Sequence, residues 1–269
     1  MSSEKSLDQI KLDCQKTVLG LHKKGNAGHI GTSLSCLDIL IYLFFKEMKE
    51  EDKFVLSKGH GAAALYTVLA ESGHIEKELL DSYYADGTLL AAHPPCAPGK
   101  VPGITFGTGS LGHGLSLAAG MALSTRYTGK KFNTYVVVSD GDCNEGSTWE
   151  AVMFAAHNKL SNLTVIVDNN DLQGFGTTHE VIEMGSLRKK WEAFDFEVVE
   201  AKNGNNFTDL EEAFTELEKR NSDKPRCIIA KTTKGSGISY MENKLEWHYL
   251  PMTDEQYQTA LSEIGASHA

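Results

Sequence analysis

The sequence predicts an α/β fold, a doubly wound parallel sheet with helices on both faces. Short apolar runs rich in β-branched residues, such as 134–139 and 163–168, have the length of buried parallel strands. Segments with apolar residues at helical spacing lie between these runs. Because strands and helices alternate along the chain, consecutive strands are expected to be parallel and joined by helical crossovers.

The first part of the chain predicts two helices around a glycine-rich loop. Apolar residues at helical spacing indicate a first helix over about residues 7–23. The glycine-rich loop, residues 25–31, ends it. Ser33 or Ser35 can then cap a second helix that runs to Phe45.

Further along, strand, loop and helix alternate. The predicted strands are residues 53–57, 134–139, 163–168, 196–201 and 226–231. The predicted helices are residues 112–127, 146–159, 185–194 and 207–220, with a short last helix near 254–264. Residues 89–108, rich in proline and glycine, should form a long ordered loop of functional use. We expect one main domain, residues 1–240, and an extension, residues 241–269, that packs on the domain or on a partner.

Composition excludes several classes of protein. The formal net charge of −10 argues against binding along a nucleic acid backbone, which needs clustered Lys and Arg. The longest apolar stretch, residues 37–45, is too short to span a membrane, and the polar start is no signal peptide. Five cysteines without a Cys-x-x-Cys motif suggest reduced thiols rather than disulfides or a zinc site. We therefore expect a cytoplasmic protein with no nucleic acid or membrane partner.

Polar clusters follow two of the predicted strands. Asp140 and Gly141 come after the strand 134–139, and Asn169-Asn170 come after 163–168. In an open α/β sheet, ligands bind beyond the carboxyl ends of the strands. A carboxylate and an amide oxygen suit a hard cation such as magnesium that holds phosphate oxygens, and glycine allows a phosphate close to the backbone. The alternative is that these residues only close turns.

The two clusters also resemble the thiamine diphosphate signature, Gly-Asp-Gly followed by Asn-Asn. Asn169 follows Gly141 after about 27 residues, and Ser139 takes the place of the first glycine, which could tighten the turn. Glycine–histidine blocks elsewhere are similar, in the same order, to blocks of the transketolase amino-terminal region. These blocks are Gly28-His29-Ile30-Gly31, Lys58-Gly59-His60-Gly61, His93-Pro94, Gly109-Ser110-Leu111-Gly112-His113-Gly114, residues 231–237 and Trp247-His248.

The resemblance implies a thiamine-diphosphate-binding fold over residues 1–240 and a set of site residues. The implied magnesium ligands are Asp140, Asn170 and the backbone carbonyl of Leu172. The implied cofactor contacts are His60, Gly109, Ser110, Leu111, Gly141, Glu145, Asn170 and His248. The implied catalytic residues are His29, His60, His93, His248 and Glu145. Imidazole both donates and accepts near neutral pH, which suits sugar hydroxyls and proton transfer.

Some positions depart from the family pattern or allow a second interpretation. Glu145 matches a glutamate at the subunit interface of the family, but it could also be an ordinary acidic residue at a helix N-terminus. His113 stands where many transketolases have glutamine, and Asp171 where many relatives have glycine. Both changes alter the hydrogen-bonding groups around the predicted site.

The resemblance implies the amino-terminal subunit of a split transketolase, which transfers a two-carbon ketol unit from a ketose to an aldose, with phosphorylated sugars expected. The family's second, pyrimidine-binding domain is expected on a separate carboxyl-terminal subunit, in a hetero-oligomer with two copies of each chain. One alternative is the α subunit of a 2-oxo acid dehydrogenase, which shares the diphosphate motif. Another is a non-catalytic partner subunit that kept the fold and lost the cofactor.

Overall fold

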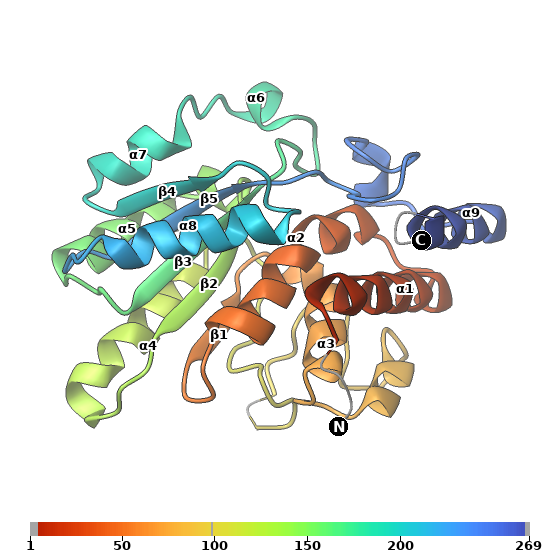
Figure 1. Cartoon of the computed structure of the whole chain (residues 1–269), viewed down its shortest axis with the longest axis horizontal. Coiled ribbons are helices and arrows are strands. Elements are labelled where there is room, and N and C mark those ends of the chain that lie inside the picture. Colours follow the sequence, from red (N-terminus) through yellow and green to blue (C-terminus); the bar gives the residue numbers. More distant parts are fainter. Residues whose placement is uncertain (1–4, 98, 267–269) are drawn as a thin grey trace.

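The computed structural model describes residues 5–97 and 99–266. Within these residues, five parallel strands form one sheet in the order β1-β2-β3-β5-β4 (Figure 1). The strands are β1 (Lys53–Leu56), β2 (Thr134–Ser139), β3 (Leu163–Asn169), β4 (Glu197–Ala201) and β5 (Arg226–Lys231). The predicted parallel sheet is confirmed, and every strand lies within one residue of its predicted bounds.

Helices cover both faces of the sheet, as a doubly wound fold requires (Figure 1). On the first side lie α1 (Leu7–Gly25), α2 (Ile30–Tyr42), α3 (Ala62–Glu71) and α8 (Phe207–Lys219), and α9 (Asp254–Ala266) packs on α1. The second face carries α4 (Gly114–Thr128), α5 (Gly146–His157) and α7 (Leu187–Ala193). A short helix, α6 (Thr178–Val181), lies in the connection between β3 and α7.

Side chains of each strand alternate between two hydrophobic clusters. In β2, Tyr135 and Val137 belong to the cluster on the first face, whereas Val136 and Val138 belong to the cluster on the second face. A strand buried on both faces has no solvent-facing positions. This is why the sequence shows continuous apolar runs rather than an alternation of apolar and polar residues.

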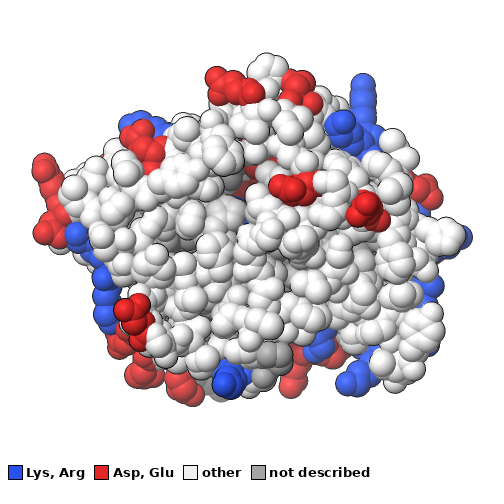
Figure 2. Space-filling view, turned by 180° about the vertical axis from the view of Figure 1, so that it is seen from behind, with Lys and Arg blue, Asp and Glu red and all other residues white. Residues whose placement is uncertain are grey.

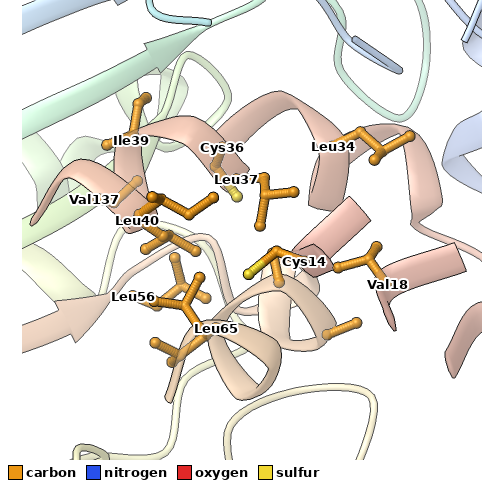
Figure 3. Close-up of a cluster of buried hydrophobic side chains, with 14 of the residues drawn as sticks. Cys14, Val18, Leu34, Cys36, Leu37, Ile39, Leu40, Leu56, Leu65 and Val137 are labelled. Atoms are coloured by element: carbon orange, nitrogen blue, oxygen red, sulfur yellow. The ribbon is translucent and has the colours of Figure 1, made fainter. Parts of the chain in front are cut away.

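The first cluster is centred on α1, α2 and α3, which pack on one another, and it also includes strand residues such as Leu56 and Val137 (Figure 3). Leu34, Leu37 and Leu40 of α2 are almost completely buried there, between α1 and the sheet. Cys14 and Cys36 are buried free thiols in the same cluster. They act as small apolar side chains, in agreement with the expectation of reduced cysteines.

The second helix begins earlier than the sequence suggested. It starts at Ile30, so the prediction that Ser33 or Ser35 caps it is wrong. Both serines lie inside α2, and their hydroxyls have partners elsewhere: Ser33 Oγ lies 3.0 Å from His22 Nε2, and Ser35 Oγ donates to Asp168 Oδ1 at 2.7 Å. These buried tertiary contacts outweigh the local preference of serine for a helix N-cap.

The other differences between the predicted and the observed helices are small. α7 begins at Leu187 rather than at residue 185, because the Ser186 side chain caps it. The short α6 was not predicted; a capping box between Thr177 and Glu180 stabilises its first turn. Over the described residues of 89–108, which exclude Pro98, the chain forms the predicted loop without helix or strand.

The carboxyl-terminal segment packs on the main body of the fold. α9 lies against α1, and Met252, Ala260 and Ile264 belong to the first hydrophobic cluster (Figure 1). The division into domains at residue 240 stays a prediction, and residues 267–269 lie outside the described part. Among the described helices, none has the length and apolar character that crossing a membrane requires.

Leu40→Ala should lower the free energy of unfolding by about 2–5 kcal/mol, because it leaves a cavity in the packed first cluster. Urea unfolding followed by circular dichroism measures the change. Leu250→Ala, at a leucine 52% exposed, is the matched control and should cost far less. Equal losses in the two variants would contradict the packing described here.

Candidate functional site

A cavity of about 430 Å³ opens at the carboxyl ends of the strands. The loops after β1, β2 and β3 contribute to it, together with the start of α2, the loop before α4 and the segment before α9. The predicted site residues that line it are His29, His60, His93, Gly109, Leu111, Asp140, Gly141, Glu145, Asn170, Leu172 and His248. Ser110 is exposed and does not line the cavity. The fold thus gathers nearly all of the predicted residues in one place, although their individual roles stay predictions.

The predicted metal ligands lie side by side on one wall. Asp140 is buried; its Oδ1 accepts from Gly141 N at 2.8 Å, whereas its Oδ2 is buried without a hydrogen-bond partner in the described part of the chain. Asn170 Nδ2 donates to Ser35 Oγ at 3.0 Å, and Asn170 Oδ1 accepts from Leu172 N, also at 3.0 Å. A buried carboxylate oxygen without a partner costs stability, and a bound cation would satisfy it.

Burial, with a smaller contribution from Asp168, raises the pKa of Asp140 to about 7. Asp168, at the end of β3, forms a completely buried ion pair with Lys58, which follows β1. Burial is the largest single influence and lowers the pKa of Lys58, but Asp168, Cys36 and Asp140 together raise it by more, so the net shift is upward. The ammonium of Lys58 therefore stays charged.

The turn after β2 is held by the buried carboxylate of Asp142. Its Oδ2 accepts from the backbone N–H of Ser139 at 2.8 Å and from the Ser139 hydroxyl at 2.9 Å. Its Oδ1 accepts from Ser57 Oγ and from Gly112 N, both at 2.7 Å. The serine in place of the family's first glycine thus adds a hydrogen bond to the turn, and Asp142 joins three loops around the cavity.

Four histidines form a cluster in the same cavity. The ring centroid of His29 lies 5.5 Å from that of His60, 5.8 Å from that of His93 and 5.2 Å from that of His248. Burial lowers the pKa of His29 to about 4 and that of His248 to about 3, and it also lowers the pKa values of His60 and His93. At neutral pH the four rings are therefore uncharged, and each has one donor and one acceptor nitrogen.

Lys234 is a site residue that the sequence alone does not reveal. Its side chain is completely buried, and its Nζ lies 2.8 Å from His248 Nδ1 and 3.3 Å from the carbonyl oxygen of Leu172. Burial, with help from Lys58, lowers the pKa of Lys234 to about 8. Most lysines are solvated, so the residue type carried no signal. Only its position in the segment 231–237, noted for its resemblance, could have drawn attention to it.

The remaining predicted positions lie at the edge of the cavity or outside it. Glu145 is exposed at the start of α5, and its side chain makes no capping hydrogen bond there. Gly112 lies close to Glu145: a Cβ atom on Gly112 would come within 2.6 Å of Glu145 Cβ. The φ of Gly112, 81°, also favours glycine at this position. His113 is exposed and does not line the cavity, and Asp171 forms an ion pair with Lys231.

Fold and cavity together define a class of protein, an α/β enzyme domain with a polar site at the carboxyl ends of parallel strands. Comparison with known proteins narrows this class. Residues 12–269 match the family described as "Transketolase, thiamine diphosphate binding domain". The chain therefore belongs to the transketolase family.

Relatives of similar length carry the names of transketolase subunits. An apulose-4-phosphate transketolase subunit of Phocaeicola vulgatus is 41% identical, over 93% of this chain and 90% of that protein. The 6-deoxy-6-sulfo-D-fructose transketolase subunit SqwG of a Clostridium species is 38% identical, over 96% of this chain and 98% of that protein. The transketolase structure from Leishmania mexicana superposes with a TM-score of 0.86 at 27% identity; the match covers 97% of this chain but only 41% of that one.

These matches make the chain the amino-terminal, thiamine-diphosphate-dependent subunit of a transketolase of the split kind, and thus a transferase subunit. They do not support the 2-oxo acid dehydrogenase alternative or the non-catalytic one.

Asp140→Asn should stabilise the metal-free chain above neutral pH, because it removes the cost of a buried ionised carboxylate. The folded-state pKa of about 7 lies above the ordinary 3.8, so between these values the unfolded carboxyl ionises while the folded one keeps its proton. The free energy of unfolding therefore falls with rising pH over this range, and the full cost is present above it. We expect a gain of about 2–4 kcal/mol at pH 8 and a smaller gain at pH 5.

Urea unfolding of both proteins at the two pH values, with a chelator present, measures this gain. Asp171→Asn, at a 57% exposed aspartate, is the control and should show no comparable pH-dependent gain. An Asp140→Asn gain that is absent, or equal at pH 5 and pH 8, would contradict the electrostatic description of the site.

Proposed function

We propose that this subunit binds thiamine diphosphate through magnesium in the cavity and transfers a two-carbon ketol unit between sugars once a partner subunit completes the site. The observation that carries the proposal is the buried Oδ2 of Asp140, which has no hydrogen-bond partner among the described residues. It lies in the same cavity wall as Asn170 and Leu172. These residues offer carboxylate, amide and carbonyl oxygens, the donor set that magnesium prefers.

The loop after β2 suits the diphosphate. Gly141 is buried, and a Cβ atom there would make a tight contact of 3.3 Å with Leu111 Cδ1, so glycine keeps the most room next to the backbone. Lys58 and Lys234 supply positive charge that acts on Asp140 in this loop. Leu111, Gly109 and the neighbouring Ser110 are proposed to lie near the other end of the cofactor, and Asp142 fixes this loop through Gly112.

When bound, thiamine diphosphate supplies a ring carbon that can take up the ketol unit and hold its electron pair. The protein's part is to bind the sugar, to orient it and to move protons. Neutral imidazoles of His29, His60 and His93 can each donate to one sugar oxygen and accept from another hydroxyl. His248 accepts from Lys234 Nζ through its Nδ1, so its Nε2–H remains to donate to a sugar oxygen. We assign all four to the sugar hydroxyls, and His60 and His248 to the cofactor as well. The substrates proposed are a ketose donor and an aldose acceptor that carry a phosphate.

We propose that the partner is a separate subunit with the pyrimidine-binding domain and that the complex contains two copies of each chain. The face shown in Figure 2 supports a large contact: its centre is almost free of charged side chains, which lie mostly along its edges. Large apolar side chains are exposed as well: Met153 and Phe154 of α5 are 51% and 44% exposed, and Phe175 at the cavity is 87% exposed. Large exposed apolar side chains are typical of protein interfaces. Glu145, exposed at the start of α5, would face this partner.

Asp140→Asn should abolish magnesium-dependent binding of thiamine diphosphate, because the carboxylate charge is lost at the metal. His29→Ala should leave this binding nearly intact but reduce ketol transfer by about 10²–10⁴-fold, because a positioned imidazole is lost. Calorimetry of the two-subunit complex measures the binding, and a coupled assay measures the transfer. Wild-type cofactor affinity in Asp140→Asn would remove the metal assignment, and lost affinity in His29→Ala would contradict this division of roles.

The isolated 269-residue chain should be inactive, and addition of the partner subunit should restore ketol transfer. The physical reason is that the cavity offers groups for the diphosphate and the sugar, whereas the pyrimidine-binding domain is proposed to lie on the partner subunit. Activity as a function of partner concentration, with light scattering for the mass of the complex, tests this. Transfer by the isolated chain at the rate of the mixture would show that no partner is needed.

A further inference from the structure

Tyr249 lies in the cavity, next to the histidine cluster. It follows His248 directly, and the centroids of the two rings are 4.8 Å apart. Its side chain lines the same cavity as His29, His60 and His93. Tyr249 is 54% exposed, and it belongs to neither hydrophobic cluster. The ring is therefore a large aromatic surface that the core does not use.

Tyr249 is held both at its hydroxyl and at its backbone. Its hydroxyl donates to the carbonyl oxygen of Gly174 at 2.6 Å, and its backbone lies against Gly28. A Cβ atom on Gly174 would come within 2.6 Å of the Tyr249 hydroxyl, and one on Gly28 within 2.6 Å of the Tyr249 carbonyl oxygen. Three segments meet here, namely the loop before α2, the loop after β3 and the segment before α9. The close fit fixes the orientation of the ring, unlike that of an ordinary surface tyrosine.

We propose that Tyr249 is a specificity-determining residue that limits the length of the sugar. This inference rests on the proposed function, since it takes the histidine cluster as the place where the sugar binds. A substrate chain that extends past His248 meets the fixed ring of Tyr249, which forms the wall of the cavity there. Short acceptors fit in front of this wall, whereas longer acceptors must displace the ring or bend away from it.

The test compares acceptors of different length with one ketose donor held constant, in the complex with the partner subunit. The acceptors are glycolaldehyde, with two carbons, and ribose 5-phosphate, with five. The quantity measured is the ratio of kcat/KM for the long acceptor to kcat/KM for the short one. In Tyr249→Ala this ratio should rise by about tenfold or more, mainly through a lower KM for the long acceptor.

Two variants serve as controls. Tyr249→Phe keeps the ring and removes only the hydrogen bond to Gly174, so its ratio should stay near that of the wild type. Tyr127→Ala removes a tyrosine that is 82% exposed on α4, outside the cavity, and should leave the ratio unchanged. Thermal unfolding of each variant confirms that it folds, and light scattering confirms that it still binds the partner.

An active complex in which Tyr249→Ala leaves the ratio unchanged would overturn this inference and leave the proposed function standing. Loss of partner binding in Tyr249→Ala would also overturn it, because the ring would then serve the subunit contact. A wild-type complex that transfers no ketol unit would overturn the proposed function, and the inference with it.

Discussion

The buried ion pair between Lys58 and Asp168 is the contact on which the site depends. Both side chains are completely shielded from solvent, and the pair joins the loop after β1 to the end of β3, across the intervening strand β2. Ser35 of α2 and Thr232 after β5 also donate to Asp168. Removal of one partner would leave an uncompensated charge inside the protein, which is far more costly than loss of a surface pair. Through Asp168, the ion pair and these two hydrogen bonds therefore hold α2, β3 and the loops after β1 and β5 in one arrangement.

The electrostatics of the cavity follow from this arrangement. The buried charged groups near the carboxyl ends of the strands include two carboxylates, Asp140 and Asp168, and two ammonium groups, Lys58 and Lys234. The four histidines of the cavity are neutral imidazoles, and the Lys234 ammonium lies 2.8 Å from one of them, His248. Lys234 thus connects the charged groups proposed for the diphosphate and the metal with the uncharged rings proposed for the sugar. The hydroxyls of a sugar can bind to such rings without having to displace a strongly held ion.

The sequence predicted the sheet well and the site only in part. Buried parallel strands such as β2 and β3 produce long apolar runs, so their positions follow from local pattern alone. The gathering of His29 and His248 is different, since they are more than 200 residues apart and no periodicity relates them; only family resemblance suggested it. The start of α2 and the burial of Lys234 were missed because tertiary contacts, which local rules do not include, decide both.

The unpartnered oxygen of Asp140 also links the cofactor to the amount of folded protein. A ligand that binds only the folded chain shifts the folding equilibrium by mass action. If magnesium and thiamine diphosphate satisfy this carboxylate, the empty subunit is the less stable form, and cellular proteases and chaperones encounter it more often. The abundance of the subunit would then follow the supply of the vitamin from which its cofactor is made, without any dedicated regulatory protein.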